Sequence, residues 1–161
     1  MQRALSPRPP PRILHGVTRS DSIDLYAAVR ACLEPRPEIA EAYVFGSHAR
    51  GQAQAHSDLD VAVFVEEPRP PEGGFGYAAA LAAELMAATR MSRVDVVVLN
   101  DAAPVLYHRV LRDGQRVLSR DLCRTTTREG RALSRYCDYV PQLAKIDAVL
   151  RRRIESGDFG K

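Results

Sequence analysis

The chain has 161 residues and a nearly balanced charge, with 23 lysines and arginines, 20 aspartates and glutamates, and a formal net charge of +3. This length suits one domain with a helical extension, and so mild a charge does not by itself indicate nucleic-acid binding. No apolar run approaches the roughly 20 residues that a membrane-spanning helix needs, so a membrane protein is not expected.

The N-terminal segment and the cysteines bear on where the protein works. Residues 1–18 are rich in proline and arginine, which predicts an extended or disordered tail in front of the domain. They contain no apolar stretch of the kind found in a secretory signal, so we expect a cytoplasmic protein. The cysteines are odd in number and lack CxxC spacing, which indicates free thiols rather than disulfides or zinc ligands: Cys32, Cys123 and Cys137.

One helix and one strand are predicted directly after the tail. Ser20 or Asp21 is expected to cap a helix that runs to about Leu33. The Pro-Arg-Pro sequence at 35–37 is expected to end this helix, because the residue before a proline avoids the helical conformation. The apolar residues 42–45 then predict a strand.

A motif suited to phosphate and metal chemistry comes next. Gly46-Ser47 is followed, after ten intervening residues, by Asp58 and Asp60. A Gly-Ser turn at a helix N-terminus offers backbone N–H groups and a hydroxyl to phosphate oxygens. If Asp58 and Asp60 both lie on the strand that continues through the apolar residues 59–65, they share one face. There they repel each other unless a cation such as Mg²⁺ lies between them. Each piece alone is also typical of an ordinary turn or strand end, but the combination is far more specific.

A third aspartate is predicted on a later strand. Residues 68–76 form a loop rich in proline and glycine that could lie over the site, and the Ala- and Leu-rich residues 77–90 predict a helix packed on the sheet. The β-branched run at 93–100 predicts a buried strand with Asp95 opposite to its valines. A buried carboxylate there is costly unless it is paired or bound to a metal. The alternative is a salt bridge between Asp95 and a neighbouring arginine such as Arg93.

One more helix and one more strand precede the C-terminal segment. Asn100 or Asp101 is expected to cap a helix that continues through about Arg112. The Asp-Gly pair at 113–114 is expected to close it, because glycine commonly follows the end of a helix. Residues 117–118 predict a short edge strand.

The C-terminal segment 122–161 is predicted to be mainly a helix, interrupted or kinked near Pro141. Arginines at steps of four, three and four form a basic stripe, which is either a solvated face or a docking surface for an acidic partner or for phosphates: Arg124, Arg128, Arg131 and Arg135. Apolar residues at steps of three or four belong to the core or, in part, to an interface: Leu133, Tyr136, Val140, Leu143, Ile146 and Leu150.

The motif and the third aspartate resemble a known family. Gly46-Ser47, ten residues, Asp58-Leu59-Asp60 and Asp95 on a later strand resemble the polymerase-beta-type nucleotidyltransferase superfamily. The wording Gly-Ser-His-Ala-Arg-Gly followed by His-Ser-Asp-Leu-Asp-Val-Ala-Val, on a small chain, resembles the minimal nucleotidyltransferases (MNT), the antitoxins of HEPN–MNT toxin–antitoxin pairs. The resemblance covers about residues 20–121 and implies an α/β fold for a domain at 19–121, in which helices flank a mixed sheet.

The resemblance also implies roles for these residues. Asp58, Asp60 and Asp95 would be the catalytic residues and would bind Mg²⁺, with two ions expected to stabilise the attacking and leaving oxygens of the displacement. Gly46 and Ser47 would bind the β- and γ-phosphates of ATP, the expected substrate.

The implied reaction is AMPylation of a partner protein. AMP would pass from ATP to a hydroxyl, expected to be a tyrosine, of a HEPN ribonuclease toxin and would neutralise it. Arg50 either neutralises the charge of the triphosphate or forms a surface ion pair. His48 and His56 are expected to be polar neighbours of the site rather than catalysts, because metal-assisted transfer needs no histidine.

Two alternatives stay open at this point. An antitoxin of this fold could act only by covering the toxin, although a pure binding protein has no need for three acids at these positions. A small-molecule nucleotidyltransferase, for example one that modifies aminoglycosides, is the other alternative. The short C-terminal segment argues against it, because little chain is left to build a substrate domain.

Overall fold

Two apolar strands at the centre of the chain pair in antiparallel fashion and form the middle of the sheet. The computed structural model describes residues 19–54, 56–66 and 76–156. The sheet has four strands in the order β3-β2-β1-β4, namely β1 (Ile39–Phe45), β2 (Leu59–Val65), β3 (Val94–Val98) and β4 (Gln115–Ser119). Strand β1 is antiparallel to β2 and β4, whereas β2 and β3 are parallel. The expected mixed sheet is confirmed, and β4 is the expected edge strand.

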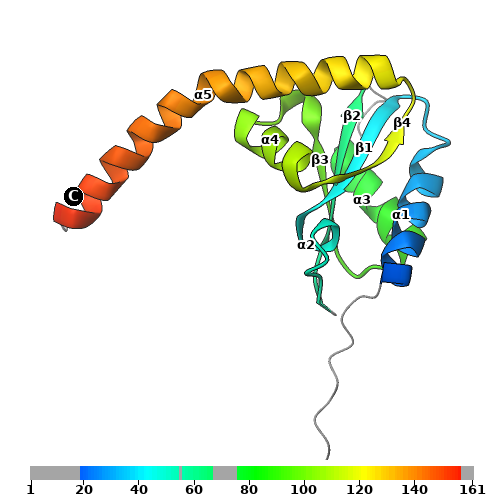
Figure 1. Ribbon diagram of the computed structural model, residues 1–161. Coiled ribbons are helices and arrows are strands. Elements are labelled where there is room, and N and C mark those ends of the chain that lie inside the picture. Colours follow the sequence, from blue (N-terminus) through cyan, green and yellow to red (C-terminus); the bar gives the residue numbers. More distant parts are fainter. Residues whose placement is uncertain (1–18, 55, 67–75, 157–161) are drawn as a thin grey trace, which may run out of the picture.

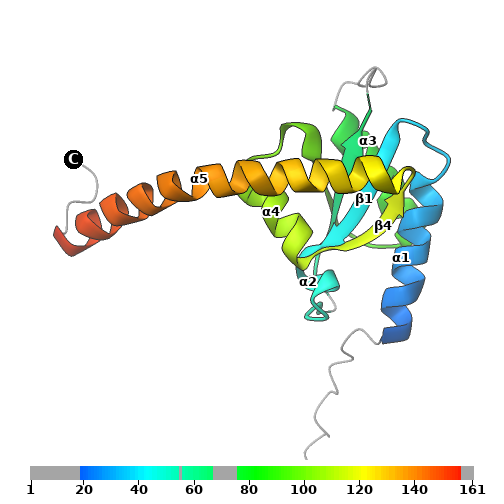
Figure 2. The same ribbon diagram turned by 45° about the horizontal axis from the view of Figure 1, so that its top comes forward.

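Helices cover both faces of this sheet (Figure 1, Figure 2). One face is covered by α1 (Arg19–Leu33) and α3 (Tyr77–Thr89), and the other by α4 (Pro104–Asp113) and the first part of α5 (Leu122–Ser156). The short helix α2 (Gly46–Ala49) follows β1 at the lower end of the sheet in Figure 1. The α/β arrangement of a mixed sheet flanked by helices, with a C-terminal helical segment, is therefore confirmed.

Each face of the sheet has its own hydrophobic core, because side chains alternate between the two faces of a strand. The larger core lies against α1 and α3 and includes the fully buried residues Val29, Leu33, Val61, Leu81 and Leu85. The smaller core lies against α4 and α5 and consists of Tyr43, Phe45, Ala62, Leu99, Tyr107, Val110 and Ala132. By the same alternation, Asp60 lies on the face of β2 that carries the smaller core.

Helix α4 starts later than predicted. Asn100 and Asp101 do not cap it; they belong to a 3-10 turn, η1 (Leu99–Asp101), and α4 begins at Pro104. Proline is well suited to the first position of a helix, because its φ is already helical and it has no N–H to leave unpaired. The Asn100 side chain instead forms two hydrogen bonds to the backbone at the end of β2. Its Nδ2 donates to the carbonyl oxygen of Val65 at 2.7 Å, and its Oδ1 accepts from the Val65 N–H at 3.0 Å.

The start of α1 also differs from the prediction. Ser20 and Asp21 lie inside α1 and do not cap it, since the helix is described from Arg19. The predicted tail at 1–18 lies outside the described residues, as does all of the predicted loop at 68–76 except Gly76. The cysteines are free thiols, as expected: Cys32, Cys123 and Cys137.

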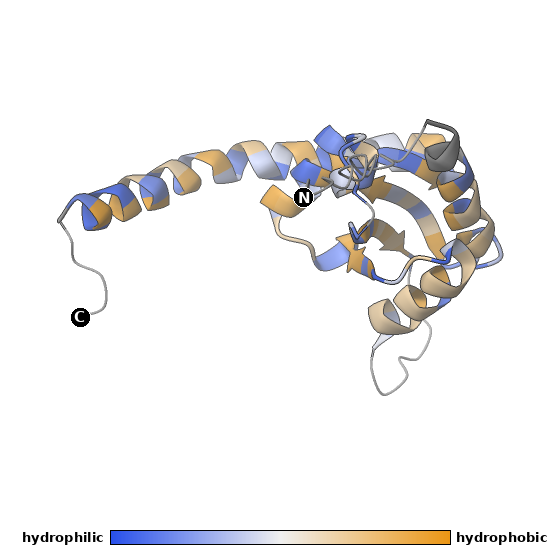
Figure 3. Ribbon diagram, turned by 90° about the horizontal axis from the view of Figure 1, so that it is seen from below, coloured by the Kyte–Doolittle hydropathy of each residue, from blue (hydrophilic) through white to orange (hydrophobic). Residues whose placement is uncertain are grey.

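Helix α5 projects beyond the sheet (Figure 1). It passes through Pro141 as one helix, so the predicted interruption is wrong. Its distal part bends away from the axis of its first part (Figure 1), which agrees with the predicted alternative of a kink. The distal part exposes large apolar side chains, including Val140, Ile146, Leu150 and Ile154, and apolar and polar residues alternate along it (Figure 3). No helix in the described part of the chain is long and apolar enough to cross a membrane.

Candidate nucleotide and metal site

Gly46 lets the chain turn tightly beside the second strand. Phe45, the last residue of β1, pairs with Asp60 in β2, so Gly46 lies next to the Asp60 carboxylate. The φ of Gly46 is 71°, a left-handed conformation that favours glycine. A Cβ built on Gly46 would lie 1.9 Å from the Oδ2 atom of Asp60, so a larger residue does not fit unless Asp60 moves. The Gly-Ser turn and the aspartates are therefore adjacent in space.

The three predicted aspartates lie at the same end of the sheet. Asp60 pairs in register with Asp95 across the parallel strands β2 and β3, and Asp58 lies directly before β2, which begins at Leu59. Asp95 is exposed, because β3 is an edge strand of the sheet. The expectation that Asp95 is a buried carboxylate is therefore wrong. The argument that a buried charge at this position needs a metal ion does not apply to Asp95.

The electrostatic surroundings of Asp60 give a separate argument for a bound cation. The pKa of Asp60 lies above its ordinary value, mainly because the carboxyl group is partly buried, and further because Asp95 and Asp58 carry like charges nearby. Arg109 and His48 act in the opposite direction and lower this pKa. The contributions of Asp95 and Asp58 indicate that three negative charges lie close together at this end of the sheet, where a cation would be stabilised.

The donor chemistry of these acids fits Mg²⁺, which prefers carboxylate oxygens. In the structure the Oδ1 atom of Asp58 lies 3.4 Å from the Nε atom of Arg93, whose side chain is 75% exposed. Among the residues that the structure describes, no group of three acidic, histidine or cysteine side chains is arranged to hold a metal ion as it stands. Asp58 would therefore exchange its arginine partner for the ion, and the exposed Arg93 side chain is free to move into solvent.

Ser47 and Arg50 follow Gly46 in the chain, Ser47 within α2 and Arg50 directly after it. Ser47 lies in α2, directly after Gly46, and is partly buried. The Nη1 atom of Arg50 lies 3.6 Å from Oδ2 of Asp113, and its Nε donates to Oε1 of Gln52 at 3.2 Å. The structure thus contains the surface ion pair that was the alternative for Arg50, and a role with phosphates would require Arg50 to leave Asp113.

The two histidines differ in their surroundings. His48 is buried, and its Nε2 atom lies 3.5 Å from the carbonyl oxygen of Ser57, directly before Asp58. The Tyr26 hydroxyl donates to the His48 carbonyl oxygen at 3.3 Å, which fixes α2 on α1. His56 is exposed. His48 therefore holds the segment that leads into the aspartates, in keeping with the expected role of a polar neighbour.

Arg109 is a charged residue near the acids that sequence reasoning missed. It is an exposed residue of α4, and its positive charge lowers the pKa of Asp60. No local pattern marks Arg109, because only the packing of α4 on the sheet brings it close to a strand that is far away in sequence. An exposed guanidinium beside crowded carboxylates can bind the phosphates of a nucleotide.

The comparison with protein families identifies the class of protein. The family model described as polymerase beta, nucleotidyltransferase matches residues 28–122, which is more than half of the chain. The chain therefore belongs to this nucleotidyltransferase family, as the Gly-Ser turn and the aspartates indicated. A comparison with curated proteins gives no match.

Solved structures of similar fold come from toxin–antitoxin complexes. A variant of the MntA–HpeT toxin–antitoxin complex contains a chain that is 25% identical, with a TM-score of 0.63 over 77% of this chain and 96% of that chain. A toxin–antitoxin complex with AMP-PNP gives 24% identity and a TM-score of 0.66, over 78% and 98% of the two chains. A complex of the tri-AMPylated HEPN toxin of Shewanella oneidensis with its MNT antitoxin gives 22% identity and a TM-score of 0.58, over 82% and 98%.

Proposed function

We propose that this protein is an MNT-type antitoxin of the cytoplasm, which transfers AMP from ATP to a tyrosine hydroxyl of a partner HEPN ribonuclease toxin. The observation that carries the proposal is the meeting of Gly46 and Ser47 with Asp58, Asp60 and Asp95 at one end of the sheet. Similar chains occur in complexes with AMP-PNP and with a tri-AMPylated HEPN toxin, which supports ATP as the substrate and a protein as the acceptor.

The reaction is an in-line displacement at the α-phosphorus of ATP. The acceptor oxygen bonds to this phosphorus while the bond to the oxygen that bridges to the β-phosphate breaks, so AMP is transferred and pyrophosphate leaves. The hydroxyl proton passes to a carboxylate. Asp95 suits this role, because it is exposed toward an arriving acceptor and pairs in register with Asp60. Gly46 and Ser47 bind the β- and γ-phosphates, and Arg109 and Arg50 neutralise their charge.

Asp58, Asp60 and Asp95 are the residues that would hold Mg²⁺, with two ions expected. Bound Mg²⁺ supplies positive charge to the attacking and leaving oxygens. A triphosphate is negatively charged, as are Asp58 and Asp95, which lie close to Asp60. The carboxylates by themselves would therefore repel it. A cation between the acids and the nucleotide is therefore needed before the triphosphate can bind beside them.

The test combines the protein, Mg²⁺, ATP labelled at the α-phosphate, and a HEPN-family protein encoded beside its gene. Intact-mass analysis of the acceptor should show the addition of AMP units. Asp58→Asn should abolish this addition, because the metal site loses a carboxylate. The matched control is Asp24→Asn, which removes an exposed carboxylate from α1 on the opposite face of the sheet and should transfer AMP at the wild-type rate.

The other outcomes decide between the alternatives. A stable complex without AMP transfer would overturn the enzymatic proposal in favour of an antitoxin that acts only by binding. The absence of both a complex and transfer would favour a small-molecule nucleotidyltransferase. Wild-type transfer by Asp58→Asn would remove this aspartate from the site.

A further inference from the structure

A groove separate from the aspartates lies between the end of β2 and helix α5. Two adjoining cavities of about 530 and 580 Å³ share four lining residues, which are Phe64, Asn100, Arg128 and Arg131. Arg124 lines the first cavity and Arg135 the second. We call this surface the arginine groove and define it by these six residues. All four arginines of the basic stripe predicted on the C-terminal helix therefore line one groove.

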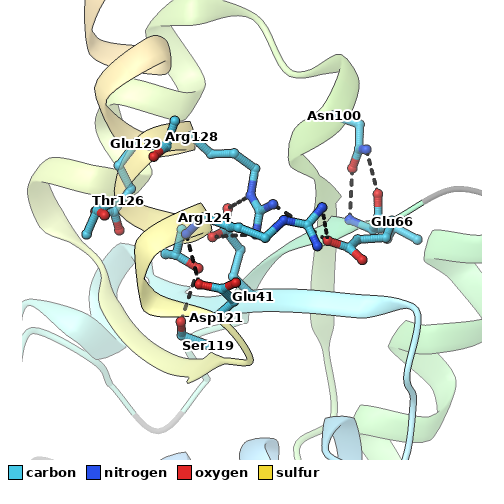
Figure 4. Close-up of polar contacts among 12 residues, drawn as sticks. Glu41, Glu66, Asn100, Ser119, Asp121, Arg124, Thr126, Arg128 and Glu129 are labelled. Atoms are coloured by element: carbon cyan, nitrogen blue, oxygen red, sulfur yellow. Dashed lines mark hydrogen bonds and ion pairs between the residues drawn. The ribbon is translucent and has the colours of Figure 1, made fainter.

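The two arginines nearest to the start of α5 have structural partners (Figure 4). The Nε of Arg128 donates to Oε1 of Glu41 at 3.3 Å, and Glu41 is fully buried. The Nη2 of Arg124 lies 2.9 Å from Oε1 of Glu66, and the Nη1 of Arg128 lies 3.7 Å from the same oxygen. These contacts fasten α5 to β1 and β2. Arg124 and Arg128 are therefore largely neutralised within the molecule.

The other two arginines are available for a ligand. Arg131 and Arg135 are exposed and lie one turn apart on α5, and neither forms an ion pair with another residue in the described ranges. A guanidinium binds a carboxylate through two parallel hydrogen bonds. Two of them, one helical turn apart at the mouth of a groove, match a short run of carboxylates.

The groove faces the same side of the sheet as the aspartates. Phe64 and Asp60 point to the same face of β2, because they are four residues apart on one strand. At about 3.3 Å per residue, the groove begins about 13 Å along the strand from Asp60. An extended chain segment of about four residues spans that distance. A polypeptide that places a hydroxyl at the aspartates can therefore reach the groove with neighbouring residues.

We propose that the arginine groove binds an acidic segment of the protein acceptor, with Arg131 and Arg135 as the residues that bind its carboxylates. The proposal rests on the proposed function, because it places the acceptor's acidic residues close to the hydroxyl that receives AMP. The groove is poorly suited to single-stranded nucleic acid, which stacks its bases on aromatic rings. The guanidinium of Arg128 lies over the Phe64 ring at 4.5 Å from its centroid, and the Tyr107 side chain in the groove wall is buried.

The test measures binding apart from catalysis. The probe is a fluorescein-labelled random copolymer of glutamate and tyrosine in a 4:1 ratio, and the readout is fluorescence anisotropy. The double variant Arg131→Glu/Arg135→Glu should bind at least tenfold more weakly than the wild type. The matched control, Arg151→Glu/Arg152→Glu, makes the same charge change on exposed residues of α5 outside the groove and should stay within twofold of the wild type. Arg131→Gln/Arg135→Gln, which removes the charges without reversing them, should also lose affinity.

The outcomes separate this proposal from the proposed function. Asp58→Asn should bind the copolymer like the wild type, so a failure of AMP transfer leaves the binding result intact. The proposal is overturned if Arg131→Glu/Arg135→Glu binds normally while circular dichroism shows a folded protein. It is also overturned if the control pair loses as much affinity, because net charge would then explain the binding. Tighter binding of a 20-nucleotide oligouridine, with the same loss in the groove variant, would replace it with a nucleic-acid site.

Discussion

At the scale of single residues, two glycines test whether the Gly-Ser turn must contact Asp60. Gly46 and Gly51 have φ values of 71° and 66°, so alanine at either position adds about 1–2 kcal/mol of backbone strain. A Cβ on Gly46 would meet Asp60 Oδ2 at 1.9 Å, whereas nothing lies within 4 Å of a Cβ on Gly51. We expect Gly46→Ala to displace Asp60 and to abolish AMP transfer, and Gly51→Ala to retain most of it. Initial transfer rates at saturating ATP are the measurement.

The comparison of the two alanine variants isolates the contact, because backbone strain is common to both. Unfolding in urea should show that both variants are folded, with Gly46→Ala the less stable of the two. Equal loss of transfer in both variants would mean that the turn acts through its backbone conformation rather than through its closeness to Asp60.

Asp60 also predicts how stability depends on pH and on Mg²⁺. Its pKa is raised in the folded state, so the folded protein holds this proton more tightly than the unfolded chain does. In EDTA, the free energy of unfolding should therefore fall as the pH rises from the ordinary carboxyl pKa through the raised one. Asp60→Asn should remove this contribution and unfold at a higher temperature than the wild type at neutral pH. Mg²⁺ should stabilise the wild type more than the variant.

The measurement is the melting temperature of the wild type and of Asp60→Asn, each in EDTA and in Mg²⁺. Asp24→Asn serves as the control, since its carboxylate is exposed on α1; it should respond to Mg²⁺ as the wild type does. An Asp60→Asn variant that melts below the wild type in EDTA would contradict the proposed crowding of charge. An equal effect of Mg²⁺ on both proteins would place the ion elsewhere.

At the scale of elements, a buried ion pair fastens α5 to the sheet. Glu41 of β1 is fully buried, accepts hydrogen bonds from Arg128, and accepts another from the Tyr107 hydroxyl at 3.2 Å. Arg128→Met would leave this carboxylate without its counter-charge, and removal of one member of a buried pair lowers the free energy of unfolding by about 3–5 kcal/mol. Urea denaturation measures the loss. Arg30→Met, which breaks the exposed pair with Glu34, should change stability little.

A double variant gives the check on that explanation. Glu41→Met/Arg128→Met removes both charges, and apolar replacements of buried pairs are often tolerated. It should therefore recover part of the stability that Arg128→Met loses. If Arg128→Met costs no more than Arg30→Met, then the ion pair does not hold α5 in place.

Comparison of the helices and strands with the prediction shows which features of the fold are determined by the local sequence. The strand at Leu59–Val65 and the helix from Tyr77 appear where the apolar pattern predicted them, because their periodicity is set by burial on one face. The start of α4 was missed, because the bond between Asn100 and the β2 backbone depends on a contact between distant segments. The burial of Glu41 was not predicted either, since its partner comes from α5.

The residues of the candidate site also fall into those that the local sequence indicates and those that only tertiary contacts bring together. Gly46, Ser47, Asp58 and Asp60 belong to one motif with a fixed spacing, so the sequence alone indicates their chemistry. Their adjacency to one another and to Asp95 follows from strand pairing, which only the superfamily resemblance could imply. Arg109 had no such signal, because helix packing alone brings it to Asp60.

At the scale of the whole molecule, the distal half of α5 separates from the body of the protein. The stacked rings of His108 and Tyr136, with centroids 3.7 Å apart, join α5 to α4. Farther along, the helix exposes large apolar side chains, and Figure 1 shows that it projects outward from the sheet. A chain that ends at Gln142 keeps every α5 residue of the smaller core and of the arginine groove.

We therefore expect truncation after Gln142 to leave the melting temperature within about 3 °C of the full chain, since exposed side chains contribute little to stability. Tyr136→Ala in the full chain is the comparison. It removes a stacked ring from the junction, and a loss of about 1 kcal/mol or more should lower the melting temperature by several degrees. Differential scanning calorimetry at two protein concentrations is the measurement. A large, concentration-dependent loss on truncation would contradict this expectation and would show that the distal helix is covered by a second copy of the chain, because only contacts between molecules depend on protein concentration.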